Sequence, residues 1–207
     1  MGSATTICSD KTGTSRMTVV KTCFTMNVKD VNKLSDSIDL CSEIPNFVLK
    51  TLLQSIFNNT RGEVIASKYG KSDILGTQTE TALLQFGLAV GGNFQVERPD
   101  GKITKVEPFN YTKKCMGVVL EICDGSLRAH AKGISKIILT PFDKLETRFS
   151  PITDIPVFGY TYIGILGIKD LVHPGLRESF ALCPSAGVDV RIVTNDNINI
   201  ATAIARE

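Results

Sequence analysis

The last third of the chain alternates between two kinds of apolar pattern, and this alternation constrains the fold more than any other feature. Residues 162–168 and 188–194 are short apolar runs rich in β-branched side chains, which are typical of strands. Residues 174–186 and 197–206 have the apolar spacing of helices. The order strand, helix, strand, helix predicts a parallel sheet. The predicted fold class is therefore α/β.

The start of the chain predicts strands that could join the same parallel sheet, whereas the middle predicts a different arrangement of helices and antiparallel strands. Residues 5–8 predict a strand that ends in a polar loop, and residues 17–24 predict a second strand. The polar stretch 27–39 is interpreted as a loop or linker. The middle predicts an α+β insertion with antiparallel hairpins. Its expected elements are helices near 48–57, 77–91 and 134–138, and strands at 102–109, 116–123 and 126–131.

Composition excludes several classes of function. The 23 Lys and Arg residues nearly balance 21 Asp and Glu residues, so the net charge of +2 argues against a polybasic nucleic-acid or membrane-surface binder. The longest apolar stretch, residues 157–168, is shorter than the roughly 18 residues that a transmembrane helix needs. No signal peptide is visible. The six Cys form no C-x-x-C pair and only two His occur, which argues against structural zinc and favours reduced, mostly buried thiols.

Asp10 follows the first predicted strand, and ligands of open α/β sheets bind at the carboxyl ends of strands. A carboxylate followed by Lys11, small hydroxyl residues and Gly13 has the groups that a nucleophile toward phosphate needs. Composition alone favours the simpler interpretation, a polar turn after a strand. The second late strand ends in a similar way. Thr194 could hydrogen-bond a phosphoryl oxygen, whereas Asp196 is also an ordinary helix N-cap.

Six short segments, in chain order, resemble the motifs of P-type ATPases. Residues 8–14, CSDKTGT, resemble the family's phosphorylation motif, and this run is highly specific. The other matches are TETA at 79–82, PFNYTKK at 108–114, KG at 132–133, GIKD at 167–170 and TNDN at 194–197. The amino-acid sequences of these segments are most similar to those of plant autoinhibited, calmodulin-regulated calcium pumps of type IIB. The resemblance covers essentially the whole chain.

The resemblance implies two domains. A discontinuous phosphorylation domain with a haloacid-dehalogenase-like fold would occupy residues 1–22 and 157–207. A shortened nucleotide-binding domain would be inserted at residues 23–156. The phosphorylation domain would be incomplete, because the family's later lysine and Mg²⁺-binding aspartates have no counterpart before Glu207.

The resemblance also implies ATP and Mg²⁺ as cofactors. ATP would place its adenine against Phe109, near Glu80 and Lys132, and its γ-phosphate at Asp10, where an aspartyl-phosphate would form. Mg²⁺ would bind the Asp10 carboxylate and the Thr12 backbone carbonyl, its remaining ligands being absent. The implied phosphoryl-transfer residues are Asp10, Lys11, Thr12, Thr194 and Asp196, and the implied ATP-binding residues are Glu80, Phe109, Lys113, Lys132, Gly133 and Asp170.

Each of these ATP-binding candidates also has a structural interpretation. Phe109 offers a flat apolar face to a purine, but a core aromatic at the end of a strand fits the pattern as well. Lys113 and Lys132 offer positive charge to a polyphosphate, yet a single lysine is more often a solvated surface charge. Glu80 stands three residues after Thr77 and matches a capping box, a role compatible with nucleotide binding.

As a whole, the chain resembles a catalytic fragment of a calcium-transporting ATPase. The full-length parent would be membrane-associated, in the plasma membrane or an endomembrane, and this chain would lie on its cytosolic face. Ca²⁺ would be handled by membrane helices outside this chain, the calmodulin site would also lie elsewhere, and no nucleic acid would bind. We expect the chain alone to be catalytically incompetent.

Two other interpretations remain open at this stage. One is a non-catalytic nucleotide-binding remnant of a truncated pump gene. The other is a soluble phosphatase with the same phosphorylation-domain fold. The missing Mg²⁺-binding aspartates argue against independent turnover, and the motifs of Phe109 and Lys132 argue against the phosphatase.

Overall fold

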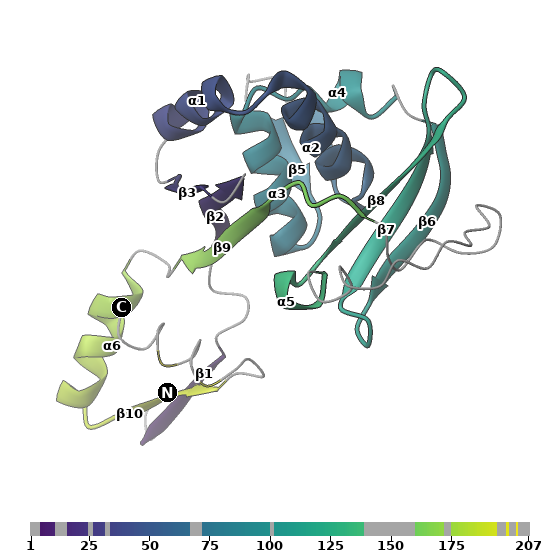
Figure 1. Cartoon of the computed structure of the whole chain (residues 1–207). Coiled ribbons are helices and arrows are strands. Elements are labelled where there is room, and N and C mark those ends of the chain that lie inside the picture. The colour runs from purple at the N-terminus through teal and green to yellow at the C-terminus, as the bar shows by residue number, and fades with distance from the viewer. Residues whose placement is uncertain are drawn as a thin grey trace. The chain divides into compact units, whose positions relative to one another are not determined.

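The computed structural model of this chain describes residues 5–10, 16–24, 27–31, 34–66, 72–99, 102–138, 160–171 and 175–193, with residues 198 and 202. The chain has a mixed α/β fold, whose elements are labelled in Figure 1. It divides into two compact units. The terminal unit comprises Met1–Thr18 and Lys169–Glu207, and the middle unit comprises Val19–Ile168. No helix in the described residues is both long and apolar enough to cross a membrane.

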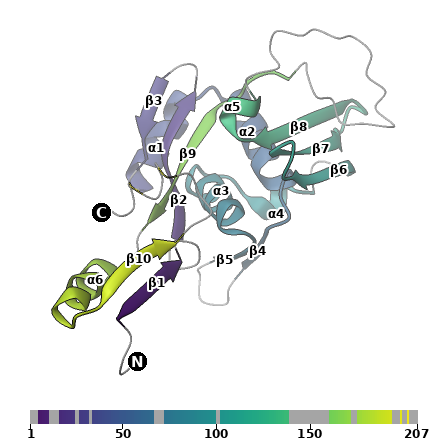
Figure 2. The ribbon, with the colours of Figure 1, turned by 90° about the horizontal axis from the view of Figure 1, so that it is seen from below.

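The terminal unit is built on a parallel strand pair. Strand β1 (Thr6–Asp10) pairs with β10 (Asp189–Val193), and Asp10 stands opposite Val193. Helix α6 (Leu176–Ser185) lies next to β10, as Figure 2 shows. The two strand ends therefore lie at the same edge, as expected for a parallel pair. The helix predicted at 197–206 falls almost entirely outside the described residues.

Strand β9 (Ile165–Leu171) does not join this parallel pair in the part of the chain that the structure describes, so that element of the prediction is wrong. It pairs instead with β2 (Arg16–Phe24), in a sheet of order β3-β2-β9. Gly164 lies against Phe24, and Gly167 lies against Lys21, so the two strands run in opposite directions. The Tyr162 hydroxyl also donates to the Cys23 carbonyl oxygen at 3.1 Å. Glycine at these positions leaves room for the close approach of β2.

The stretch 27–39 contains regular structure, so its interpretation as a loop or linker is also wrong. It contributes β3 (Asn27–Asp30) and the first turns of α1 (Leu34–Glu43). Strand β3 pairs antiparallel with β2, and the Val31 N–H donates to the Val20 carbonyl at 2.8 Å. The polar side chains of this segment show no apolar pattern from which a strand could be predicted. The strand forms because its backbone groups hydrogen-bond to β2, which does not depend on the type of side chain.

The predicted helices of the middle unit are confirmed and form its core. Two of them are α2 (Asn46–Asn58) and α3 (Gln78–Ala89). The short α4 (Phe94–Glu97) that follows them was not predicted. Figure 1 shows α2 and α3 close together, and they are in contact. Helix α3 begins at the predicted capping box and ends just before Gly91, whose φ of +85° suits glycine.

The predicted hairpins form a three-stranded antiparallel sheet of order β6-β7-β8, visible in Figure 2. Strand β6 (Lys102–Asn110) is exposed, whereas every residue from 116 to 120 of β7 (Cys115–Glu121) is buried. The turn before β8 (Leu127–Gly133) has Gly125 at a φ of +79°. The remaining elements are the hairpin β4 (Glu63–Ala66) and β5 (Ser72–Leu75), and the short helix α5 (Ser135–Ile138).

The thiols are less buried than the sequence suggested. Cys8 and Cys123 are exposed, and the other four cysteines are half-buried. The expectation of mostly buried thiols is therefore wrong.

Candidate functional site

The predicted site residues divide according to how far the structure describes them. Lys11, Thr12, Thr194 and Asp196 lie outside the described residues. Of the predicted aspartates, Asp10 ends β1 and Asp170 lies in β9, and only their backbones are described. The remaining five are fully described, and all are in the middle unit: Glu80, Phe109, Lys113, Lys132 and Gly133.

The Glu80 carboxylate is buried at the start of α3 and accepts four hydrogen bonds. Its Oε1 accepts from the Arg61 N–H at 2.8 Å and from the Thr60 hydroxyl at 3.2 Å. Its Oε2 accepts from the Thr77 N–H at 3.1 Å and from the Thr77 hydroxyl at 2.9 Å. The carboxylate thus closes the capping box of α3 and also fastens the segment that leads into β4.

These donors decide the charge of Glu80. Burial alone would raise the pKa of the carboxyl group. The hydrogen bonds from Arg61 and Thr77, together with the positive charge of Lys132, outweigh burial and hold this pKa below its ordinary value. Glu80 is therefore a carboxylate at neutral pH, and it supplies a fixed negative charge inside the middle unit.

Lys132, on β8, is the electrostatic counterpart of Glu80. Burial lowers its pKa to about 8, although the charge of Glu80 acts in the opposite direction. The Lys132 Nζ is buried and has no hydrogen-bond partner among the described residues. A buried ammonium group without hydrogen bonds is costly, and such groups usually have a functional explanation.

Phe109 lies on the same row of the sheet as Lys132. The pairing of β6 with β7 shifts between Glu107 and Asn110, so Pro108 and Phe109 together form a bulge opposite Met116. Met116 in turn pairs with Lys132 on β8. Phe109 and Lys132 are thus two strand spacings apart, about 10 Å between backbones. The Phe109 side chain is 43% exposed, so it is not the core aromatic that the sequence also allowed.

Lys113 and Gly133 have local partners. The Lys113 Nζ donates to Glu107 Oε1 at 2.8 Å, which forms an exposed ion pair. At Gly133, an added Cβ would lie 2.6 Å from the Lys114 carbonyl oxygen. Glycine therefore permits the close approach of the end of β8 to the turn before β7.

Sequence reasoning assigned no role to Tyr111 or Lys114, which also lie at this turn. The Tyr111 ring packs edge-to-face with Phe109 at 5.3 Å between centroids, and the Lys114 Nζ lies 5.6 Å from the centre of the Tyr111 ring. The one sequence feature that could have pointed to them is the second aromatic residue, Tyr111, of the PFNYTKK segment.

A buried polar cluster behind the sheet joins β8 to α2. His130 Nε2 lies 3.2 Å from Gln54 Oε1, which also accepts from Arg128 at 3.0 Å. Because the amide oxygen can only accept, the neutral ring carries its proton on Nε2. Burial, and secondarily the charge of Arg128, lowers the pKa of His130 to about 4.

The depressed pKa of His130 predicts a loss of stability in mild acid. The unfolded state binds a proton near pH 6.5 and the folded state only near pH 4, so stability falls as the pH decreases through this window. Between pH 7 and pH 5 we expect a loss of about 2 kcal/mol from this residue, measured by urea unfolding. His130→Gln removes the titration and is the control. An equal pH dependence in this variant would contradict the assignment.

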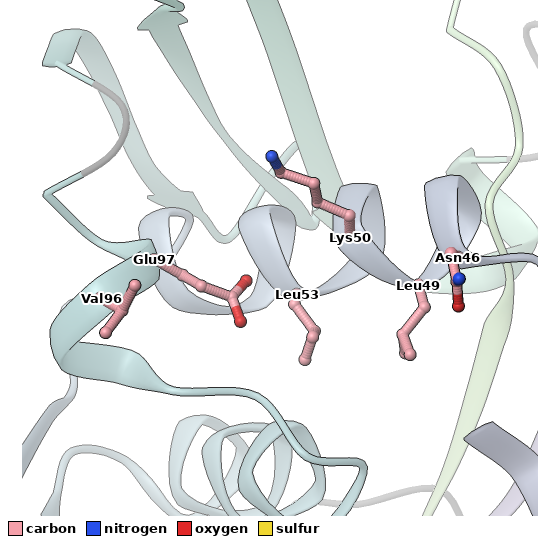
Figure 3. Close-up of a pocket in the computed structure, with 6 residues that line it drawn as sticks. All are labelled: Asn46, Leu49, Lys50, Leu53, Val96 and Glu97. Carbon is pink, nitrogen blue, oxygen red and sulfur yellow. The ribbon is translucent and has the colours of Figure 1, made fainter.

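The described surface also has a groove of about 320 Å³ away from these residues. Asn46, Leu49, Lys50 and Leu53 of α2 and Val96 and Glu97 of α4 line it (Figure 3). Leu49 and Leu53 project on one side of α2, and Lys50 projects on the other. None of the predicted site residues lines the groove, so it is not part of the candidate site.

No metal site emerges from the part of the chain that the structure describes. Within it, no group of three or more His, Cys, Asp or Glu residues could hold a metal ion. The predicted Mg²⁺ ligands, the Asp10 carboxylate and the Thr12 carbonyl, lie outside that part. The terminal unit brings the ends of β1 and β10 to the same edge, because Asp10 pairs with Val193. Val193 directly precedes the predicted site residue Thr194 in the sequence.

Comparisons with known proteins agree with the resemblance seen in the motifs. Residues 48–149 match the family model of the P-type ATPase cytoplasmic domain N. The whole chain aligns with Calcium-transporting ATPase 10, plasma membrane-type, of Oryza sativa subsp. japonica at 51% identity over 250 residues. It aligns with Calcium-transporting ATPase 2, plasma membrane-type, of Arabidopsis thaliana at 49% identity over 251 residues.

These alignments also define how much of the relatives this chain represents. The chain is covered completely, but it covers only 24% and 25% of these two relatives. It therefore spans about a quarter of their length. The alignments are also longer than the 207 residues of this chain, so the relatives have residues in this region without a counterpart here.

Proposed function

We propose that the middle unit binds ATP, since residues 48–149 match the family model of the P-type ATPase cytoplasmic domain N. The observation that carries the proposal is the Lys132 ammonium, buried beside Glu80 without a hydrogen-bond partner in the described residues. A polyphosphate or a base acceptor atom would supply the missing acceptor. The exposed Phe109 ring, on the same row of the sheet, offers a stacking surface to the adenine.

The five described residues take different parts in this proposal. Phe109 holds the base, and Lys132 supplies positive charge. Glu80 positions Lys132 and the surrounding backbone, because all four of its hydrogen bonds go to protein donors. Lys113 adds charge at the edge of the site while paired with Glu107. Gly133 keeps the end of β8 close to the turn at Lys114.

We further propose that the chain is the cytoplasmic catalytic region of a calcium-transporting pump. Its nucleotide-binding domain would comprise residues 23–156 and its haloacid-dehalogenase-like phosphorylation domain residues 1–22 and 157–207. Asp10 would accept the phosphoryl group, with Lys11, Thr12, Thr194 and Asp196 around it, and Asp170 would contact the ATP. The parallel pairing of β1 with β10 supports this arrangement, because it brings two of these segments to one edge. The names of the relatives support transport of calcium at the plasma membrane.

Two groups outside the chain belong to this proposal. Bound Mg²⁺ would neutralise phosphate charge for attack by a carboxylate. ATP would supply the phosphoryl group. The residues of this chain would orient the nucleotide, hold a positive charge beside it and exclude water from the Lys132 ammonium.

Titration calorimetry with ATP tests the binding proposal. We expect a dissociation constant between about 0.1 and 1 mM, or about −5.5 to −4 kcal/mol. Phe109→Ala combined with Lys132→Ala should weaken binding at least tenfold, because stacking and a charge contact are both lost. Phe47→Ala combined with Lys50→Ala removes the same residue types from α2 and is the matched control. Equal affinities of the two double variants would contradict the assigned site.

The pH dependence of the affinity gives a second readout. Lys132 has a pKa of about 8, so its ammonium is present below this pH and is lost as the pH rises. Affinity for ATP should therefore decrease above pH 8. In Lys132→Met the affinity should be low and nearly independent of pH between 7 and 9. A wild-type affinity that does not change across this range would exclude Lys132 as the titrating contact.

A further inference from the structure

The turn between β6 and β7 carries a second exposed aromatic ring, that of Tyr111, which packs against Phe109 and has no part in the proposed function. Tyr111 is 80% exposed and Phe109 is 43% exposed. Their rings lie 5.3 Å apart at an interplanar angle of 90°. Because the two rings are perpendicular, one face of the Phe109 ring and one face of the Tyr111 ring enclose a right angle, which we call the aromatic corner. Two neighbouring exposed rings offer a planar ligand apolar faces on which to stack.

Hydrogen bonds to the side chain and the carbonyl group of Asn110 constrain this turn. The Asn110 Oδ1 accepts from the N–H groups of Thr112 at 2.8 Å and Lys113 at 3.0 Å. The Lys114 N–H donates to the Asn110 carbonyl at 2.6 Å. Lys114 has a φ of +53°, the single positive value among the described non-glycine residues. The Tyr111 ring is therefore presented by a constrained backbone, which reduces the entropy lost when a ligand binds.

Lys114 adds a charge to the corner. Its Nζ lies 5.6 Å from the centre of the Tyr111 ring, in cation–π range. This contact helps to fix the orientation of the ring toward Phe109. It also gives the corner a positive border, which suits a ligand that is aromatic at one end and anionic at the other.

We propose that Tyr111 is a second contact for the base of a purine nucleotide, forming one wall of an aromatic corner whose other wall is Phe109. This inference rests on the proposed function, since it concerns the same nucleotide site. A base stacked on one ring presents its edge to the other ring, because the two rings are perpendicular. The bicyclic purine has the area to contact both walls. Tyr111 is a specificity-determining residue for the base and has no part in holding the phosphates.

The test compares ATP with inorganic tripolyphosphate, which has the same anionic chain but no base. Tyr111→Ala should weaken ATP binding about tenfold, in the range found for loss of one stacking contact. It should leave the affinity for tripolyphosphate unchanged within twofold. Tyr111→Phe keeps the ring and should stay within about twofold of wild type for both ligands. Phe47→Ala removes a comparably exposed ring from α2 and should change neither affinity.

Each alternative result identifies what has failed. If Phe109→Ala weakens ATP binding and Tyr111→Ala does not, the aromatic corner is wrong and the proposed function stands. If Tyr111→Ala weakens ATP and tripolyphosphate equally, its effect is not on the base and the inference is overturned. If the wild-type chain binds no ATP, both proposals fail. Circular dichroism of each variant verifies its fold, which substitution of an exposed side chain should not change.

Discussion

Replacing Glu80 by alanine is expected to lower the free energy of unfolding by about 3–5 kcal/mol. The substitution leaves the N–H groups of Arg61 and Thr77 without their acceptor and removes the capping box of α3. It also removes the negative charge beside the buried Lys132 ammonium. Urea unfolding at pH 7 measures the loss.

Two further variants separate these contributions. Glu80→Gln keeps the shape and part of the accepting capacity but loses the charge, so we expect a smaller loss of about 1–2 kcal/mol. Glu63→Ala removes an exposed carboxylate from the nearby strand β4 and should change stability by less than about 0.5 kcal/mol. A Glu80→Ala variant that is as stable as wild type but does not bind ATP would mean that Glu80 contacts the nucleotide directly. Such a result would refute its positioning role.

Replacing Phe57 by alanine is expected to cost about 3–5 kcal/mol, because its side chain is completely buried at the centre of the middle unit. The ring packs edge-to-face with Phe94 at 5.5 Å between centroids. Gly87 and Gly92 also approach it so closely that an added Cβ on either would lie within 3 Å of the ring. The cavity left by alanine would therefore face backbone that has little freedom to move.

Phe47→Ala is the matched control for this prediction. Phe47 lies on the same helix α2, and its side chain is 74% exposed. Its replacement should change the free energy of unfolding by less than about 0.5 kcal/mol. Comparable losses in the two variants would contradict the assignment of Phe57 to the centre of the core. Chemical denaturation of both variants under one set of conditions gives the comparison directly.

The local elements of the middle unit were predictable because their signals lie within a few neighbouring residues. The capping box at Thr77 and Glu80 marks the start of α3 as it does in the structure. The Asp124-Gly125 turn likewise predicts the β7–β8 hairpin, where Gly125 takes the left-handed conformation that glycine favours. In both cases the side chain or backbone freedom of one residue decides the local geometry.

The partners of the strands were less predictable, because they depend on residues far away in the chain. An alternating strand and helix pattern assigned β9 to the parallel sheet, but Gly164 and Gly167 accommodate β2 instead. The polar segment of β3 was missed since its stability comes from backbone pairing with β2. No periodicity within either segment contains this information.

The candidate site likewise has features that the sequence predicts and features that only the folded structure shows. The sequence by itself predicted that Glu80 closes a capping box at the start of a helix, and it placed Glu80, Phe109 and Lys132 in segments that resemble the motifs of one family. Only the tertiary structure decided that Lys132 is buried beside a fully hydrogen-bonded Glu80 and that Tyr111 meets Phe109 at a right angle. The physical reason is that burial, pKa and ring geometry arise from neighbours brought together by folding. A residue's type and spacing state which groups are available, and the packing of the chain determines which of them meet.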